Sequence, residues 1–235
     1  MELKNSACVI TGAARGLGRE LARELVARGA RVVLSDIDSL DLLDLGKELG
    51  MPAVHCNVTD REQVITLGRT AVDTFGAIDI WINNAGIWTA YTPAESIDFG
   101  KAHQLIEVNY FGTAYGMIEA MNHMKPRGTG MIVNILSVRA LKGKALGATY
   151  SASKFAAEGF TQAVREELKD SGISVIGMYP YRMKTGLFGE DKHDDYDQSM
   201  DPTDVAKIMI DNLAETNPSE HIEIWGTEDV RKKRE

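Results

Sequence analysis

Apolar and polar residues follow two patterns that take turns along this chain. Short runs that are apolar throughout are separated by longer segments in which apolar residues recur every three or four positions. The first pattern is typical of strands buried on both faces, and the second is typical of amphipathic helices. The predicted strands are 7–11, 31–36, 53–56, 78–85, 130–137, 173–180 and 221–225.

Predicted helices lie between these strands. They cover 17–29, 39–50, 60–76, 101–125, a segment from about 150 to 172, and 202–215. Strands that alternate with helices form a parallel sheet covered on both faces. The pattern therefore predicts an α/β protein with a Rossmann fold, whose seven-stranded parallel sheet is doubly wound. No linker or repeat divides the chain, so we expect a single domain over 1–235.

One segment departs from this alternation. Residues 186–201 are acidic and poor in apolar side chains. A loop of that length in a compact domain is usually a lid or a disordered insert. We therefore expect a flexible substrate lid at 186–201.

Composition narrows the classes of function. The net charge of −8 argues against nucleic-acid binding, because phosphate contacts need a basic surface. The basic tail 231–235 is interpreted as a solvated terminus. No window approaches the ~20 apolar residues of a membrane span, and the start does not resemble a secretory signal. The histidines and the 2 cysteines show no metal-ligand spacing, so we expect a cytoplasmic protein without a metal site.

A glycine-rich turn follows the first predicted strand. It reads 11-TGAARGLG-18, with glycines at 12, 16 and 18, and it opens a helix. Glycines let the backbone turn sharply and approach a ligand, and the helix directs free N–H groups toward an anion. In this context the turn predicts a site for the pyrophosphate of a dinucleotide.

The end of the second predicted strand bears on which dinucleotide binds. Asp36 lies there, and a carboxylate at this position can accept the ribose hydroxyls of adenosine and repel a 2′-phosphate. Arg15 in the glycine turn favours the 2′-phosphate instead. We give Asp36 the greater weight and expect NAD rather than NADP. The alternative is that Asp36 is only a turn residue.

A tyrosine and a lysine lie four residues apart in 150-YSASK-154. On a helix these positions share a face, so the phenol and the ammonium should point the same way. Alone, the pair could equally belong to a solvated helix face. Ser137, at the end of the fifth predicted strand and 13 residues before Tyr150, adds a hydroxyl at the edge of the sheet where ligands gather.

Together these motifs resemble the short-chain dehydrogenase/reductase family. The resemblance rests on 11-TGAARGLG-18, 83-NNAG-86, Asn109, Ser137 and 150-YSASK-154, and it extends from about residue 5 to about residue 210. It implies an oxidoreductase that transfers a hydride between a nicotinamide cofactor and a secondary alcohol or ketone. The alternative is a non-catalytic dinucleotide-binding protein that acts as a redox sensor or scaffold.

The resemblance also implies roles for particular residues. Tyr150 would be the general acid/base, and Lys154 would favour the phenolate and hold the nicotinamide ribose. Ser137 would hydrogen-bond the substrate oxygen. Asn109 would kink its helix and support a water chain from Lys154 to solvent.

The cofactor-binding residues that the resemblance implies run from the glycine turn to the end of the sixth strand. They are Gly12, Arg15, Gly16, Leu17, Gly18, Asp36, Ile37, Asn57, Val58, Asn84, Ala85, Gly86, Tyr150, Lys154, Pro180, Met183 and Thr185. Asn57 replaces the aspartate that the family usually has, but its amide oxygen could still accept a bond from the adenine amino group.

Tyr181 departs further, because the family usually has glycine after Pro180. Our hypothesis is that it forms part of the substrate pocket wall. The alternative, a surface tyrosine with no role, has equal weight. The expected substrate residues are Ser137, Tyr150, Trp88, Tyr181, Leu187 and Phe188, with Tyr91, Leu141 and Leu146 as further apolar candidates. Such a lining suits small or medium alcohols and ketones.

The resemblance implies partners as well. Members of the family usually form homodimers or homotetramers through the helices that hold Asn109 and Tyr150. The apolar positions of 112–121 and 155–160 agree with this, but they agree equally with packing inside one chain.

Overall fold

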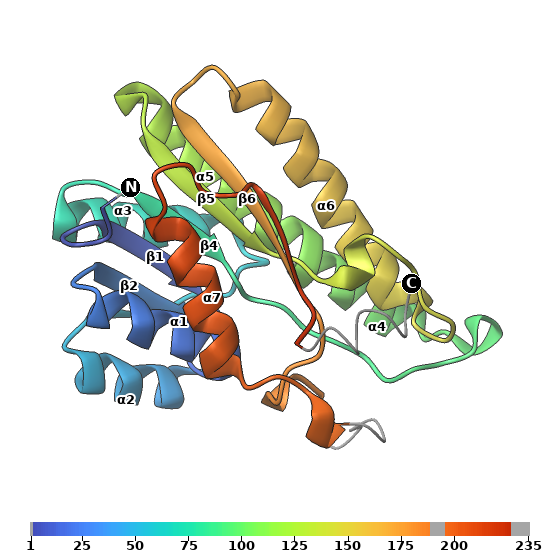
Figure 1. Cartoon of the computed structure of the whole chain (residues 1–235). Coiled ribbons are helices and arrows are strands. Elements are labelled where there is room, and N and C mark those ends of the chain that lie inside the picture. The colour runs from blue at the N-terminus through green and yellow to red at the C-terminus, as the bar shows by residue number, and fades with distance from the viewer. Residues whose placement is uncertain (1, 189–195, 227–235) are drawn as a thin grey trace.

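The computed structural model describes residues 2–188 and 196–226. Its strands are β1 (Ala7–Thr11), β2 (Arg31–Asp36), β3 (Ala53–His55), β4 (Ile80–Asn83), β5 (Gly130–Ile135), β6 (Ile173–Pro180) and β7 (His221–Ile224). All of them pair in parallel in one sheet of order β3-β2-β1-β4-β5-β6-β7 (Figure 1). The predicted seven-stranded Rossmann fold is confirmed.

Helices cover both faces of this sheet. The α-helices are α1 (Gly16–Ala27), α2 (Ser39–Leu49), α3 (Arg61–Phe75), α4 (Phe99–Ile106), α5 (Thr113–Met124), α6 (Ala148–Leu168) and α7 (Pro202–Ala214). A π-helical segment, η2 (Glu107–Gly112), joins α4 to α5. Short 3₁₀ turns are η1 (Ala94–Ser96), η3 (Lys125–Arg127), η4 (Val138–Ala140), η5 (Gly186–Phe188) and η6 (Tyr196–Gln198).

The strands are apolar throughout because each contributes to two cores. In β1, Cys8 and Ile10 pack with α1, α2 and α7, whereas Val9 packs with α3, α5 and α6 on the opposite face. In β2, Val32 and Val33 divide in the same way. Successive strand residues point to opposite faces, so a sheet buried between two helix layers needs apolar residues at consecutive positions.

Predicted and observed elements differ mainly at their ends. β4 and β5 each end two residues before their predicted ends. α6 ends at Leu168 rather than 172, where Gly172 adopts a left-handed conformation with φ of 76°. The single helix predicted over 101–125 is replaced by α4, η2 and α5.

Predictions that fall on residues outside the described ranges stay predictions. The lid predicted at 186–201 includes residues 189–195, and the domain predicted over 1–235 includes these and residues 227–235, all outside the described residues. The basic tail lies entirely outside them. Among the helices in the described residues, none has the length and apolar character needed to cross a membrane. The location in the cell stays a prediction.

Candidate active site

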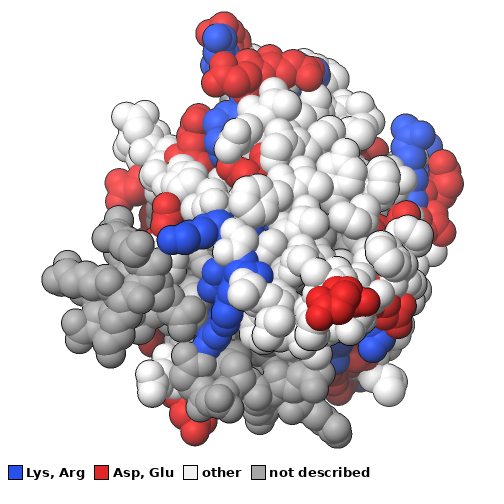
Figure 2. Space-filling view, turned by 90° about the vertical axis from the view of Figure 1, so that its right-hand side faces the viewer, with Lys and Arg blue, Asp and Glu red and all other residues white. Residues whose placement is uncertain are grey.

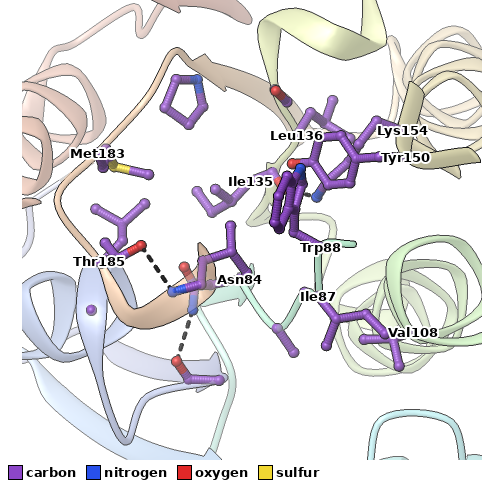
Figure 3. A pocket seen from close by; sticks show the side chains of 18 of the residues that line it. Asn84, Ile87, Trp88, Val108, Ile135, Leu136, Tyr150, Lys154, Met183 and Thr185 are labelled. Carbon is purple, nitrogen blue, oxygen red and sulfur yellow. Dashed lines mark hydrogen bonds between the residues drawn. The ribbon is translucent and has the colours of Figure 1, made fainter. Parts of the chain in front are cut away.

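The carboxyl ends of the strands open onto a pocket of about 450 Å³. Its walls come from the segments that follow β1 to β6. The chain order of the strands reverses between β1 and β4, which is the place where doubly wound sheets bind ligands. Figure 3 shows Tyr150, Lys154 and Trp88 close together at one side of the pocket, with Met183 and Thr185 across from them.

The glycine turn packs too closely for side chains at two of its positions. A Cβ on Gly12 would lie 2.7 Å from the Ala85 Cα, and a Cβ on Gly18 would collide with the Gly12 carbonyl oxygen. Gly12 also has a φ of 66°, which glycine adopts without strain. α1 begins at Gly16, and the Arg15 side chain makes no capping hydrogen bond to its first turn. The first N–H groups of α1 are therefore available to an anion.

The end of β4 clamps this turn in place. The Asn84 Nδ2 donates to the carbonyl oxygens of Thr11 at 3.0 Å and Gly12 at 2.8 Å. The Thr11 hydroxyl oxygen in turn accepts from the backbone N–H groups of Asn84 and Ala85, both at 3.1 Å. Asn84 thus acts mainly on the position of the turn, and these bonds end the β4 ladder at Asn83.

Asp36 is oriented by two backbone groups. The Ala14 N–H donates to one of its carboxylate oxygens at 2.9 Å, and the Asp38 N–H donates to the other at 3.0 Å. The carboxylate lines the pocket at the end of β2. The structure therefore supports more than a turn role for Asp36, because its carboxylate links the turn to the pocket.

The side-chain amide oxygen of Asn57 already accepts hydrogen bonds within the protein. It accepts from the Thr59 N–H at 3.1 Å and from the Thr59 hydroxyl at 2.9 Å. A carbonyl oxygen has two lone pairs, so this oxygen is already satisfied within the protein. The expected bond from Asn57 to an adenine amino group stays a prediction, and the structure does not favour it.

Tyr150 lies in the first turn of α6, next to Ser137 at the end of the β5 segment. Burial raises the pKa of the Tyr150 phenol to about 12, and the hydrogen bond with Ser137 and the positive charge of Arg139 act in the opposite direction. Ser137 itself is buried, and its hydroxyl oxygen accepts from the Arg139 N–H at 3.1 Å. The phenol is protonated at neutral pH in this structure.

Lys154 is buried one turn further along α6. Its ammonium donates to the Ile135 carbonyl oxygen at 3.1 Å, and burial lowers its pKa to about 8. Lys154 is not among the groups that shift the pKa of Tyr150 in this structure; Arg139 is the cation that acts there. The predicted tuning of the phenol by Lys154 therefore stays a prediction.

Asn109 lies in the π-helical segment η2 and is fully buried. Its Nδ2 donates to the Ile87 carbonyl oxygen at 2.9 Å and to the Ser153 hydroxyl at 3.0 Å, and its Oδ1 accepts from the Ile87 N–H at 2.9 Å. The irregular helix expected at Asn109 is present as η2. Its side chain joins the segment after β4 to α6, but it does not line the pocket.

Tyr181 lies in the pocket wall and stacks on Trp225, with ring centroids 5.5 Å apart. It is half-buried and packs with a small cluster that includes Leu136 and Tyr179. The structure therefore favours the pocket-wall hypothesis over an isolated surface tyrosine. Nearby, Thr185 packs against the Gly16 position of the turn.

The pocket brings together most of the residues predicted from the sequence. Its lining includes Gly12, Arg15, Gly16, Leu17, Gly18, Asp36, Ile37, Asn57, Val58, Asn84, Ala85, Gly86, Trp88, Ser137, Tyr150, Lys154, Pro180, Tyr181, Met183, Thr185 and Leu187. The Phe188 side chain lies outside the described part of the chain. Leu141 and Leu146 do not belong to the lining and are exposed.

Three cations of this lining, Arg139, Lys144 and Arg182, were not singled out from the sequence, although the stretch 138–149 was expected to contribute to the pocket. Tyr91 was expected only as part of the apolar wall. Burial alone would raise the pKa of Tyr91, but hydrogen bonds from Lys144 and Arg182, and the charges of both, hold it below its ordinary value. The residues come from separate segments, so no local spacing could have grouped them.

Residues 6–196 match the sequence model of the short chain dehydrogenase family. The chain therefore belongs to this family. Its members are oxidoreductases that act on CH–OH groups with a nicotinamide cofactor, and the prediction of an oxidoreductase for secondary alcohols and ketones is confirmed.

Curated relatives agree with this assignment. The chain is 36% identical to a diacetyl reductase [(S)-acetoin forming] from Staphylococcus epidermidis over 186 residues, which cover 77% of this chain and 72% of the relative. It is 32% identical to a 3-alpha-(or 20-beta)-hydroxysteroid dehydrogenase from Mycobacterium bovis over 208 residues, which cover 86% and 80% of the two chains.

Solved structures share the fold. A 3-ketoacyl-(acyl-carrier-protein) reductase from Brucella melitensis, complexed with NADH, superposes with a TM-score of 0.87 at 24% identity, covering 94% of this chain and 97% of its own. A short chain dehydrogenase/reductase from Burkholderia phymatum, in complex with NAD, also has a TM-score of 0.87 at 24% identity, with coverage of 95% and 90%.

Proposed function

We propose that the protein is an NAD(H)-dependent oxidoreductase in which Tyr150 exchanges a proton with the oxygen of a secondary alcohol or ketone. The observation that carries this proposal is the convergence of Ser137, Tyr150 and Lys154 in one pocket with the glycine turn. A proton donor and an oxyanion partner are thereby close to a site shaped for a dinucleotide.

The residues of the turn fit a dinucleotide. The positions of Gly12 and Gly18 admit no side chain, and the first turn of α1 presents uncapped N–H groups. Hydride transfer is the chemistry that the bound nicotinamide supplies. We propose NAD rather than NADP because the oriented carboxylate of Asp36 would accept ribose hydroxyls and repel a 2′-phosphate. Arg15 is the residue that favours NADP.

The acid/base role follows from the state of the phenol. Because the pKa of Tyr150 is raised by burial, its O–H can donate a proton to a ketone oxygen at neutral pH. Ser137 would donate a second hydrogen bond to that oxygen. Lys154 would hold the nicotinamide ribose. Asn109 would fix η2 against α6 through its hydrogen bond to Ser153.

We also propose that copies of the chain associate through the face formed by α4, α5 and α6. Phe99, Ile118 and Phe155 on these helices are exposed. White, uncharged side chains cover most of the middle of the face shown in Figure 2, and charged ones lie mainly around it. Such a surface suits a homodimer or homotetramer.

Coenzyme kinetics test the proposal. We expect NADH to give a higher kcat/KM than NADPH with a panel of ketones, and the preference to weaken in Asp36→Ala, because that variant loses the ribose acceptor. A higher kcat/KM with NADPH in the wild type would contradict the coenzyme assignment. Binding of NADH, seen by its fluorescence, without oxidation by any ketone would favour a redox sensor instead.

A further inference from the structure

The end of the pocket beyond Tyr150 is lined by the cationic residues Arg139, Lys144 and Arg182. The first two follow β5 and the third follows β6. Among the described residues that line the pocket, the one acidic side chain is Asp36, at the opposite end beside the glycine turn. The described part of the lining is therefore positively charged where the substrate is expected.

All three cations contact aromatic rings. The Lys144 ammonium lies 4.4 Å from the ring centroid of Tyr91 and 3.2 Å from its hydroxyl oxygen. The guanidinium carbons of Arg139 and Arg182 lie 5.9 Å and 5.5 Å from the ring centroid of Tyr181. Cation–π contacts orient a cation without neutralising its charge.

Arg139 and Lys144 have no carboxylate partner within the part of the chain that the structure describes. Five other arginines of the described residues do pair with carboxylates, as Arg23 does with Glu48 at 2.7 Å. Cations that line a pocket without an ion pair are suited to pair with an anionic ligand.

Arg139 is also close to the proposed reacting centre. It is two residues past Ser137, its backbone N–H donates to the Ser137 hydroxyl oxygen at 3.1 Å, and its charge acts on the Tyr150 phenol. A ligand whose oxygen binds between Ser137 and Tyr150 would therefore lie within reach of the Arg139 charge.

We propose that the substrate is an anionic ketone or secondary alcohol whose negative group is held by Arg139 and Lys144. This inference rests on the proposed function and names its substrate class. A guanidinium can bind the two oxygens of a carboxylate, or of a phosphate, in a fixed geometry. The negative group would lie within a few bonds of the reacting carbon, since Arg139 follows Ser137 so closely.

Matched pairs of ketones test the substrate class with NADH as reductant. In the first pair, anionic pyruvate carries a carboxylate where neutral diacetyl carries an acetyl group. In the second pair, dihydroxyacetone phosphate carries a phosphate that neutral dihydroxyacetone lacks. We expect the anionic member of at least one pair to have a kcat/KM roughly 10- to 100-fold higher, the effect of charged hydrogen bonds. The pair that shows it distinguishes a carboxylate from a phosphate.

Variants then locate the effect. Arg139→Met and Lys144→Met should each lower the ratio of kcat/KM for the anionic over the neutral ketone roughly 10-fold, mainly through KM of the anion. Arg139→Lys should restore part of that ratio because it retains the charge. Lys47→Met removes a charge from an exposed position on α2 and should leave the ratio as in the wild type.

The outcomes separate this inference from the proposed function. If the wild type has equal kcat/KM for neutral and anionic ketones, and no variant changes that ratio, the proposed substrate class is wrong. The proposal of an oxidoreductase would then still stand. Failure to reduce any ketone despite NADH binding would overturn both. A wild-type preference for the anion that falls in either methionine variant would support the inference, and Lys144→Met provides this test if Arg139→Met does not fold.

Discussion

The buried ammonium of Lys154 shows how a charged residue of the pocket can weaken the fold. Burial lowers its pKa from 10.5 to about 8, and the Ile135 carbonyl supplies a single hydrogen bond at 3.1 Å. Below pH 8 both the folded and the unfolded chain carry this proton. Burial of the charged ammonium then lowers the free energy of unfolding by its full amount, about 3 kcal/mol. Between about pH 8 and 10.5 the unfolded chain holds more protons, and stability from this residue rises with pH.

We therefore predict that Lys154→Met stabilises the empty protein at pH 7. The free energy of unfolding should rise by about 1–3 kcal/mol, because the buried charge is lost while the Ile135 carbonyl loses one donor. Urea denaturation of both proteins at pH 7 and pH 10 measures this, and the difference should shrink at the higher pH. A variant less stable than the wild type at pH 7 would show that Lys154 stabilises the fold.

At the same scale, the motifs pointed to the residues that meet in the pocket but did not single out its cations. Ser137, Tyr150 and Lys154 could be predicted because their spacing and their places on a strand end and a helix are local features. Arg139 and Lys144 could not, because their role depends on rings from distant segments, Tyr91 and Tyr181. The cations of the pocket are defined by tertiary structure.

At the scale of elements, the glycine turn and α1 act as one unit with the end of β4. Gly18 is packed against the Gly12 carbonyl and the Asn84 amide, both of which are fixed by hydrogen bonds. A rigid neighbour cannot move aside for a methyl group, so a side chain here would displace the turn.

We predict that Gly18→Ala weakens NADH binding roughly 10- to 100-fold, the effect of overpacking a rigid site. Gly159→Ala is the matched control, because Gly159 is exposed in the interior of α6 and its added Cβ would meet open space. It should raise the free energy of unfolding by about 0.5–1 kcal/mol and leave NADH affinity as in the wild type. Fluorescence titration and urea denaturation measure the two effects; tight binding by Gly18→Ala would contradict the account of the turn.

Periodicity predicted the elements well but could not predict the break at η2. Apolar residues recur at helical spacing across 101–125, and one wider turn changes that spacing too little to be seen. Asn109 was the local sign, since an asparagine buried at the centre of a helix must find partners elsewhere. It finds them in Ile87 and Ser153.

At the scale of the whole molecule, the fold leaves apolar side chains exposed on neighbouring helices. Phe99 on α4 is 72% exposed and Phe155 on α6 is 45% exposed. Exposed apolar side chains on neighbouring helices mark a surface for association. The sequence predicted this face only through its family resemblance, because periodicity alone does not separate an interface from a core.

We predict that the protein is oligomeric in light scattering and that Phe155→Glu lowers its mass, because a charge would be buried in the interface. Leu40→Glu is the control: Leu40 is 79% exposed on α2, on the other side of the sheet. It should leave the mass unchanged. A wild-type monomer, or an equal loss of mass in both variants, would contradict the proposed interface.

In the proposed reaction, Tyr150 is the group that exchanges a proton with the substrate. Its place in the pocket, its position beside Ser137 and the tyrosine–lysine spacing of 150–154 all support that role. Phenylalanine at this position keeps the ring and removes the proton.

The most direct measurement compares Tyr150→Phe with the wild type in two properties. One is kcat for NADH oxidation with the best ketone of the panel, and the other is the affinity for NADH. We expect kcat to fall roughly 100- to 10,000-fold, the range for loss of a general acid, while the dissociation constant for NADH changes less than about threefold. A variant that retains wild-type kcat would contradict the assignment of Tyr150.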